Sequence, residues 1–223
     1  MIVLAAALAV PAMTSCERGG EPEQRAAAPV SVSFAGIPQQ GDALGDPAAP
    51  VTLTELSDLR CSHCRDFTLN ALPVLVERYV RLGHLRIVFR NLPVLGAASE
   101  RAARMAVAAG MQDRMWPFVH AFFSTRDGEG AAEVTDAFLR RVAAAVPGLD
   151  VDRALADRDE PAVRAELAEN ARLAREMGVR GVPTFTLGRT GEPARELSFR
   201  RSGDPDSFTG PVDELLESKP EAK

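Results

Sequence analysis

Cysteine, histidine and aromatic residues are scarce in this chain, and lysine is almost missing. The 223 residues include three cysteines, three histidines and one tryptophan. Three cysteines are too few for a small fold held together by disulfides. Lysine occurs only at Lys219 and Lys223, so arginine carries nearly all of the positive charge. The formal net charge of −5 argues against a nucleic-acid-binding surface, which needs a basic patch.

The chain also lacks an apolar run long enough to span a bilayer. The run from Ile2 to Ala12 is short and is followed by small residues and then Cys16. This arrangement resembles a bacterial lipoprotein signal, in which the cysteine becomes the acylated first residue of the mature protein. We therefore predict a signal peptide over 1–15, lipidation at Cys16 and a location in the bacterial cell envelope or periplasm. An ordinary cleaved signal with Cys16 merely nearby is the alternative.

The segment after the signal has little to bury. Residues 16–48 are rich in Gly, Pro, Ala, Gln and Glu, and such a composition cannot bury enough apolar surface to order itself. We predict that this segment is a flexible tether. At the other end, we predict that 219–223 is a short tail.

The region between tether and tail alternates strand and helix patterns. The predicted elements are strands at Val51–Leu56, Leu85–Asn91, Val182–Leu187 and Glu196–Arg201, and helices at Cys61–Leu82, Ala97–Thr125, Val134–Val146 and Pro161–Gly178, with a last helix after Pro205. The first strand–helix–strand unit implies parallel pairing, because its crossover is too long for a hairpin. The last two strands are joined around Gly188 to Gly191, which favours an antiparallel hairpin. The element order predicts an α/β fold.

Cys61 and Cys64 form a CxxC motif between a predicted strand and a predicted helix. A zinc site needs four ligands as a rule, and the sequence has no second CxxC and no paired histidines. A structural disulfide would close only a tiny loop and would add little stability. A redox-active pair fits best, and we expect no metal and no cofactor beyond a Cys61–Cys64 disulfide.

The place of the motif favours a reactive first cysteine. Unpaired backbone N–H groups and the helix dipole stabilise an anion at a helix N-terminus, and the thiolate is the reactive form of cysteine. We therefore expect the pKa of Cys61 to lie below its usual value. His63, when protonated, would add a second stabilising charge. Cys64 lies one turn further into the helix, which suits a less exposed, resolving cysteine.

The residues SDLRCSHCRDF, followed far downstream by GVPTF, resemble the DsbA-like branch of the thioredoxin superfamily. The resemblance covers the chain from about Pro50 to Glu217 and includes WPFVHAFF, which is similar to the helical-domain pattern of that family. It implies a thioredoxin fold, with a central mixed β-sheet in the order βαβ…ββα and an inserted all-helical subdomain. The two halves of the thioredoxin core would be 49–96 and 179–218, with the helical insertion at 97–178.

The resemblance also implies roles for individual residues. Cys61 would be the attacking cysteine and Cys64 the resolving one. Pro183 would be the cis-proline that faces the dithiol, and Val182 would offer its backbone groups to a substrate. Glu55, six residues before Cys61, matches the buried acid of the family. Burial would raise its pKa and suit it to shuttling the Cys64 proton; an exposed strand glutamate is the alternative.

Ser62 departs from the family pattern, because the strongly oxidising members have proline at this position. Ser62 and Val182 are the residues we expect to contact the substrate. The dipeptide between the cysteines tunes how far the thiolate is stabilised, and a stabilised reduced form makes a stronger oxidant. We expect the Ser62-His63 pair to place the reduction potential of the protein towards the oxidising end of the family's range.

These features predict an exported oxidoreductase that oxidises cysteine pairs of envelope proteins through a mixed disulfide. Its expected partners are cysteine-containing exported proteins and a membrane redox partner, with no nucleic acid and with membrane contact only through a lipid anchor. A reductase or isomerase of the same fold is an alternative. So is a metallochaperone that binds copper through Cys61, Cys64 and His63, because soft thiolates suit Cu(I). A binding module with an inert dithiol is a further possibility.

Overall fold

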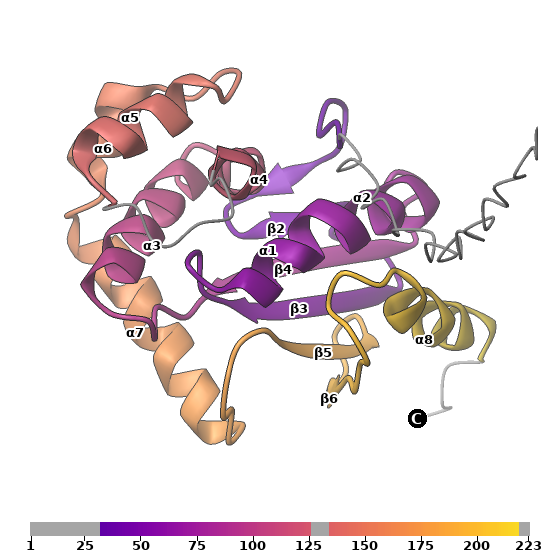
Figure 1. Ribbon diagram of the computed structural model, residues 1–223. Coiled ribbons are helices and arrows are strands. Elements are labelled where there is room, and N and C mark those ends of the chain that lie inside the picture. Colours follow the sequence, from indigo (N-terminus) through magenta and orange to yellow (C-terminus); the bar gives the residue numbers. More distant parts are fainter. Residues whose placement is uncertain (1–31, 126–133, 219–223) are drawn as a thin grey trace, which may run out of the picture.

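Residues 32–125 and 134–218 of the chain are described by a computed structural model (Figure 1). The predicted signal peptide at 1–15, the predicted lipidation site Cys16 and the predicted tail at 219–223 lie outside the described residues. Among the helices that are described, none combines the length and the apolarity that a membrane span requires.

Within the described residues, one mixed sheet has the strand order β1-β2-β4-β3-β5-β6. The strands are β1 (Gln39–Gln40), β2 (Ala43–Leu44), β3 (Val51–Ser57), β4 (Leu85–Asn91), β5 (Thr184–Arg189) and β6 (Arg195–Glu196). Strands β3 and β4 pair in parallel, and every other neighbouring pair is antiparallel. The parallel pairing of the first unit and the antiparallel β5–β6 hairpin confirm the prediction from the sequence.

The helical tract that follows β3 is continuous from Ser62 to Val80. It consists of α1 (Ser62–Asp66), the π-helical turn η1 (Phe67–Ala71), α2 (Leu72–Leu75) and the π-helical turn η2 (Val76–Val80). Pro73 lies just after η1 and has no N–H to give to the preceding turn. Single π turns inside a longer helix are the usual form in which this rare geometry occurs.

The remaining helices surround the sheet at its ends and faces. They are α3 (Ala97–Gly110), α4 (Met115–Thr125), α5 (Asp136–Ala144), α6 (Val151–Asp157), α7 (Pro161–Glu176) and α8 (Asp206–Glu217). In Figure 1, α1 and α2 cross the front of the sheet, α3, α5, α6 and α7 lie to its left, and α8 lies to its lower right. In chain order, α3 to α7 all fall between β4 and β5.

The tether predicted for 16–48 is wrong at its C-terminal end, because β1 and β2 form a hairpin there. Ala43 and Leu44 pair with β4 and are buried. The carbonyl of Asp42 accepts hydrogen bonds from the Trp116 indole N–H and from the Phe89 N–H, both at 3.0 Å. A polar, glycine-rich segment thus becomes ordered when its few apolar residues find an existing sheet edge to pair with.

The last predicted strand, Glu196–Arg201, is also shorter than expected. Strand β6 ends at Glu196, and the last bond to β5 runs from the Leu197 N–H to the Phe185 carbonyl at 2.8 Å. Further pairing would bring this segment beside Pro183. Proline has no N–H to donate to a strand partner, so the two segments separate there.

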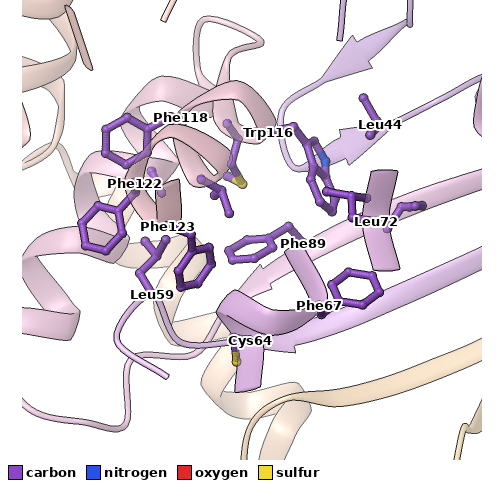
Figure 2. Packing of buried hydrophobic residues seen from close by; sticks show 14 of the residues in the cluster. Leu44, Leu59, Cys64, Phe67, Leu72, Phe89, Trp116, Phe118, Phe122 and Phe123 are labelled. Atoms are coloured by element: carbon purple, nitrogen blue, oxygen red, sulfur yellow. The ribbon is translucent and has the colours of Figure 1, made fainter. Parts of the chain in front are cut away.

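A continuous hydrophobic cluster joins the sheet to helices that pack against it (Figure 2). Phe89 of β4 meets the edge of Trp116 of α4 at 5.6 Å between ring centroids, and Phe67 packs against Phe185 of β5 at 4.7 Å. Three fully buried phenylalanines carry the cluster along α4: Phe118, Phe122 and Phe123. Cys64 lies in the same cluster, so the start of the helical tract is anchored in the core.

Candidate active site

The CxxC motif lies where β3 turns into α1. Cys61 is the N-cap residue of α1, with extended backbone angles. Its N–H donates to the Asp58 carbonyl at 2.9 Å, and its carbonyl accepts from the Arg65 N–H at 3.1 Å to open the helix. Cys61 is 9% exposed, whereas Cys64 is completely buried. Both thiols are free in this structure, which therefore represents the dithiol form.

Asp58 holds the turn before Cys61 in place. Its side chain is 1% exposed and accepts three backbone hydrogen bonds, from Arg60 N at 2.8 Å, Val94 N at 2.8 Å and Leu95 N at 2.9 Å. The loop that follows β4 is thereby tied to the redox loop. Sequence reasoning missed this residue. The available signal was an aspartate directly after a strand, where side-chain oxygens commonly satisfy loop N–H groups.

Residues 121 positions apart in the chain meet at the attacking cysteine. The Cys61 thiol donates to the Val182 carbonyl at 3.4 Å, and the peptide bond between Val182 and Pro183 is cis. The segment of Val182 and Pro183 thus faces the dithiol, in the conformation that the resemblance implied. The backbone of Val182 is close enough to the reacting sulfur to position a bound chain beside it.

The surroundings of Cys61 stabilise its thiolate. The pKa of Cys61 is lowered to about 6, with hydrogen bonding from the Cys64 thiol as the largest cause. Partial burial opposes this shift. The backbone N–H groups of Cys64 and His63 and the positive charge of His63 support it. The lowered pKa expected for Cys61 is found, but the His63 charge contributes less than the neighbouring thiol.

Cys64 and Glu55, in contrast, favour their neutral forms. Burial is the main cause that raises the pKa of Cys64, and the nearby Cys61 and Glu55 add to it. Glu55 is completely buried, as the family resemblance implied, and the alternative of an exposed strand glutamate is wrong. Burial raises the pKa of Glu55 to about 8. At neutral pH the site therefore contains Cys61 mostly as a thiolate. The Cys64 thiol is neutral, and the Glu55 carboxyl is mostly neutral.

Several buried polar atoms beneath the dithiol have no hydrogen-bond partner among the described residues. They are the two carboxyl oxygens of Glu55, Ser57 Oγ and Asn91 Oδ1. Ser57 and Asn91 are register partners on β3 and β4. The Ser57 hydroxyl lowers the pKa of Glu55 and of Cys64 and so offsets part of their upward shifts. It does not have the geometry of a hydrogen bond to either group.

The two residues between the cysteines point to solvent. Ser62 and His63 are exposed, and the His63 side chain lies 4.0 Å from the Asp66 carboxylate with 74% of its surface accessible. Of the other two histidines, His84 precedes β4 and His120 lies in α4. Across residues 32–125 and 134–218, His, Cys, Asp and Glu side chains nowhere gather in threes as a metal site would require.

A pocket of about 820 Å³ opens beside the dithiol. One wall is the start of the helical tract, with His63, Asp66 and Asn70. Val182 and Pro183 form a second wall, and the loop 199–205 forms the third. The groove is open to solvent, large enough for a few residues of a second chain, and lined by Val182, the residue whose carbonyl contacts the Cys61 thiol.

The sequence and the structure were compared with known proteins. The family model described as Thioredoxin matches residues 39–192. A relative named "Probable disulfide bond formation protein D" from Bacillus anthracis is 27% identical in an alignment of 144 positions that covers 63% of this chain. The same alignment spans 66% of that relative, just under two thirds of its length.

Solved structures show the same fold. The oxidised form of BdbD from Bacillus subtilis superposes with a TM-score of 0.69 at 19% identity, covering 82% of this chain and 98% of that one. DsbA from Chlamydia trachomatis superposes with a TM-score of 0.67 at 16% identity, covering 86% and 100%. The thioredoxin fold with additional helices that the sequence predicted is therefore confirmed.

Proposed function

Because the chain belongs to the thioredoxin family, we propose that it is a thiol–disulfide oxidoreductase that introduces disulfides into other proteins. The observation that carries this proposal is the pairing of unlike cysteines. The pKa of Cys61 is lowered to about 6, whereas that of the buried Cys64 is raised. The B. anthracis relative is named for disulfide bond formation, which supports the direction of the reaction.

In the first step, a substrate thiolate attacks Cys61 Sγ of the Cys61–Cys64 disulfide. A bond forms between the substrate sulfur and Cys61, the bond between the two protein sulfurs breaks, and Cys64 leaves with the electron pair. The Cys64 thiolate then needs a proton, because burial favours its neutral form. Glu55, whose pKa is raised to about 8, is mostly protonated at pH 7 and is suited to supply that proton.

In the second step, the other substrate thiolate attacks the substrate sulfur of the mixed disulfide. The substrate gains its disulfide, and Cys61 leaves as a thiolate, which the lowered pKa favours. Two electrons have then passed from the substrate to the protein. His63 supports the departing thiolate by its charge, and the Val182 backbone holds the substrate chain beside Cys61.

Turnover requires an oxidant that takes these two electrons from the dithiol. We propose a membrane redox partner for this step and cysteine-containing exported proteins as substrates. The signal-like N-terminus and Cys16 support a lipid-anchored envelope location. No cofactor other than the Cys61–Cys64 disulfide is needed for either exchange step.

The reduction potential tests the proposal. The full chain carrying Cys16→Ser is equilibrated in glutathione buffers, and the Cys61–Cys64 redox state is read by alkylation and mass. A potential above about −180 mV, the level of protein disulfide isomerase, supports a dithiol oxidase. A value near about −270 mV, that of thioredoxin, contradicts it and favours a reductase.

A matched control and a third outcome complete the experiment. The Cys64→Ser variant can form no internal disulfide and sets the baseline for alkylation. If Cys61 and Cys64 stay reduced at every glutathione ratio, the redox assignment fails altogether. Copper binding through the two thiols would then be the function to test.

A further inference from the structure

The groove beside the dithiol exists because a strand pair comes apart. After the Leu197 N–H bond to Phe185, no backbone N–H from Ser198 to Arg200 has a hydrogen-bond partner within the described residues. The Val182 N–H across the gap is also without a described partner. Val182 on one side and Phe199 and Arg200 on the other, with these free backbone N–H groups, line the 820 Å³ pocket.

The separation is built into the surrounding packing. Phe199 is held in the aromatic core, at 5.2 Å from Phe185 and 6.2 Å from Phe208 between ring centroids. Gly203 packs against the helical tract so closely that a Cβ there would lie 3.2 Å from Asp66 Cβ and from the Asp66 carbonyl. The loop that forms the outer wall is thus fixed at both ends, and the groove is a stable opening.

Two unpaired positive charges line this groove. Arg200 and Arg201 are exposed, and within the described chain neither guanidinium has an ion pair or a hydrogen bond. Two acidic residues, Asp66 and Asp204, also line the pocket, and each has another described partner. Asp66 faces His63 at 4.0 Å, and Asp204 accepts the Asp206 N–H at 3.3 Å. This contrasts with many arginines far from the groove, which pair with carboxylates.

From these features we infer that Arg200 and Arg201 are specificity-determining residues, which select substrates with acidic side chains next to the reacting cysteine. The inference rests on the proposed function, because it concerns the chain that exchanges disulfides with Cys61. An extended substrate segment fills the groove and takes backbone hydrogen bonds from the free groups on both sides. Its cysteine lies at Cys61, and its neighbouring side chains extend along the wall that carries the two arginines.

The expected preference is modest, because exposed ion pairs contribute little each and are screened by salt. Charge complementarity acts mainly on the encounter rate. We expect acidic neighbours to raise the second-order rate constant about three- to tenfold over neutral ones at low ionic strength. Most of this advantage should disappear in about 0.5 M salt, where the screening length falls to a few ångströms.

The test uses the disulfide form of the full chain carrying Cys16→Ser in single-turnover oxidation of dithiol peptides. Two peptides differ only by Glu or Gln on either side of the reacting cysteine. Flanking charges also change the pKa of the peptide thiol, so the quantity compared is the ratio of the Glu rate to the Gln rate. That ratio is measured in the parent protein, in Arg200→Gln/Arg201→Gln and in Arg195→Gln. Arg195 is an exposed arginine of β6 outside the pocket lining.

The inference holds if the double variant lowers the ratio about three- to tenfold and Arg195→Gln keeps the parent ratio. An unchanged ratio in the double variant, with both peptides oxidised, overturns the inference and leaves the proposed function standing. An equal loss in Arg195→Gln also overturns it, since general surface charge would then be the cause. If the disulfide form oxidises neither peptide, the proposed function fails and the inference fails with it.

Discussion

Cys61 and Cys64 are three positions apart, yet the pKa of the Cys61 thiol is lowered and that of the Cys64 thiol is raised. The difference arises from geometry, because Cys61 caps a helix and keeps 9% of its surface exposed, whereas Cys64 is completely enclosed by the core. The largest cause that lowers the pKa of Cys61 is the Cys64 thiol, and the His63 charge is the smallest of the named causes. The buried cysteine thus tunes its partner as well as resolving the mixed disulfide.

This ranking predicts the outcome of two substitutions. Cys64→Ala removes the main hydrogen bond and should raise the pKa of Cys61 most of the way to its usual value of about 8.5. His63→Ala should leave it well below that value. Thiolate absorbance near 240 nm against pH, in proteins carrying Cys16→Ser, measures both. A larger rise in His63→Ala than in Cys64→Ala would show that the histidine dominates.

Glu55 makes stability depend on pH. Its pKa is raised from 4.5 to about 8 in the folded protein, so the unfolded state ionises first as pH rises. Stability is then lost progressively from about pH 4.5 to pH 8. Glu55→Gln should remove this loss and stabilise the disulfide form by on the order of 3 kcal/mol at pH 7, and by almost nothing at pH 4.5.

Urea unfolding at several pH values measures the Glu55 effect. Glu214→Gln makes the same chemical change at an exposed position of α8 and should give a small difference at every pH. Equal stability of Glu55→Gln and the parent protein at pH 8 would mean that water reaches the Glu55 carboxyl.

At the scale of elements, Asp58 joins two loops that the sheet alone would leave independent. Replacing it with alanine removes the side-chain acceptor of three part-buried backbone N–H groups. Since a hydrogen bond to a charged group contributes about 1.5–3 kcal/mol, we expect Asp58→Ala to lower the free energy of unfolding by roughly 3 kcal/mol or more. Asp58→Asn, which keeps one acceptor oxygen, should cost less.

Denaturant unfolding of the disulfide form checks the Asp58 prediction. Asp46→Ala serves as the control, because Asp46 accepts one N–H, that of Ala48 at 2.8 Å, at an exposed turn. Asp46→Ala should lower the free energy of unfolding by much less than Asp58→Ala. Similar small losses in both variants would show that the two loops hold their positions without the Asp58 carboxylate.

Local pattern predicted some elements better than others for physical reasons. Strand β4 has the predicted bounds, and β3 is longer by one residue, because buried runs of β-branched and apolar residues carry their own signal. Helix α6 was missed; its seven residues are too few to show a helical period. The β1–β2 hairpin and the early end of β6 depend on distant partners, namely Trp116 and Pro183, which no local window contains.

At the scale of the whole molecule, the redox state should change stability in a pH-dependent way. The thiolate of Cys61 is favoured only in the folded dithiol form, with a pKa of about 6 against about 8.5 when unfolded. This contribution is present above the unfolded pKa and is lost as pH falls through 6. The dithiol form should therefore gain on the order of 1 kcal/mol relative to the disulfide form between pH 5 and pH 7.

Melting temperatures of both redox forms between pH 5 and pH 8 measure this gain. The Glu55→Gln background is preferable, because it removes the buried carboxyl that titrates in the same range. A difference between the two forms that does not change with pH would contradict the assignment of Cys61 as the low-pKa thiol.

The candidate site shows how far a single sequence can specify a three-dimensional arrangement. The CxxC motif and the helix start that activates Cys61 are local and were visible directly. The meeting of Cys61 with Val182 was expected only from the family resemblance, since 121 positions separate them. Asp58 and the arginine-lined groove were not predicted, because their roles depend on loops that approach one another only in the folded chain.

The open strand edge beyond β6 also bears on how the protein avoids associating with itself. A free backbone edge is a template for any extended chain, including the same edge of a second copy. Two copies that met there would bring Arg195, Arg200 and Arg201 against their own counterparts. Such like-charge contact opposes pairing. The arginines proposed to attract acidic substrates would thus also protect the protein from edge-to-edge aggregation. Neutralising them would favour self-association of two copies through this edge.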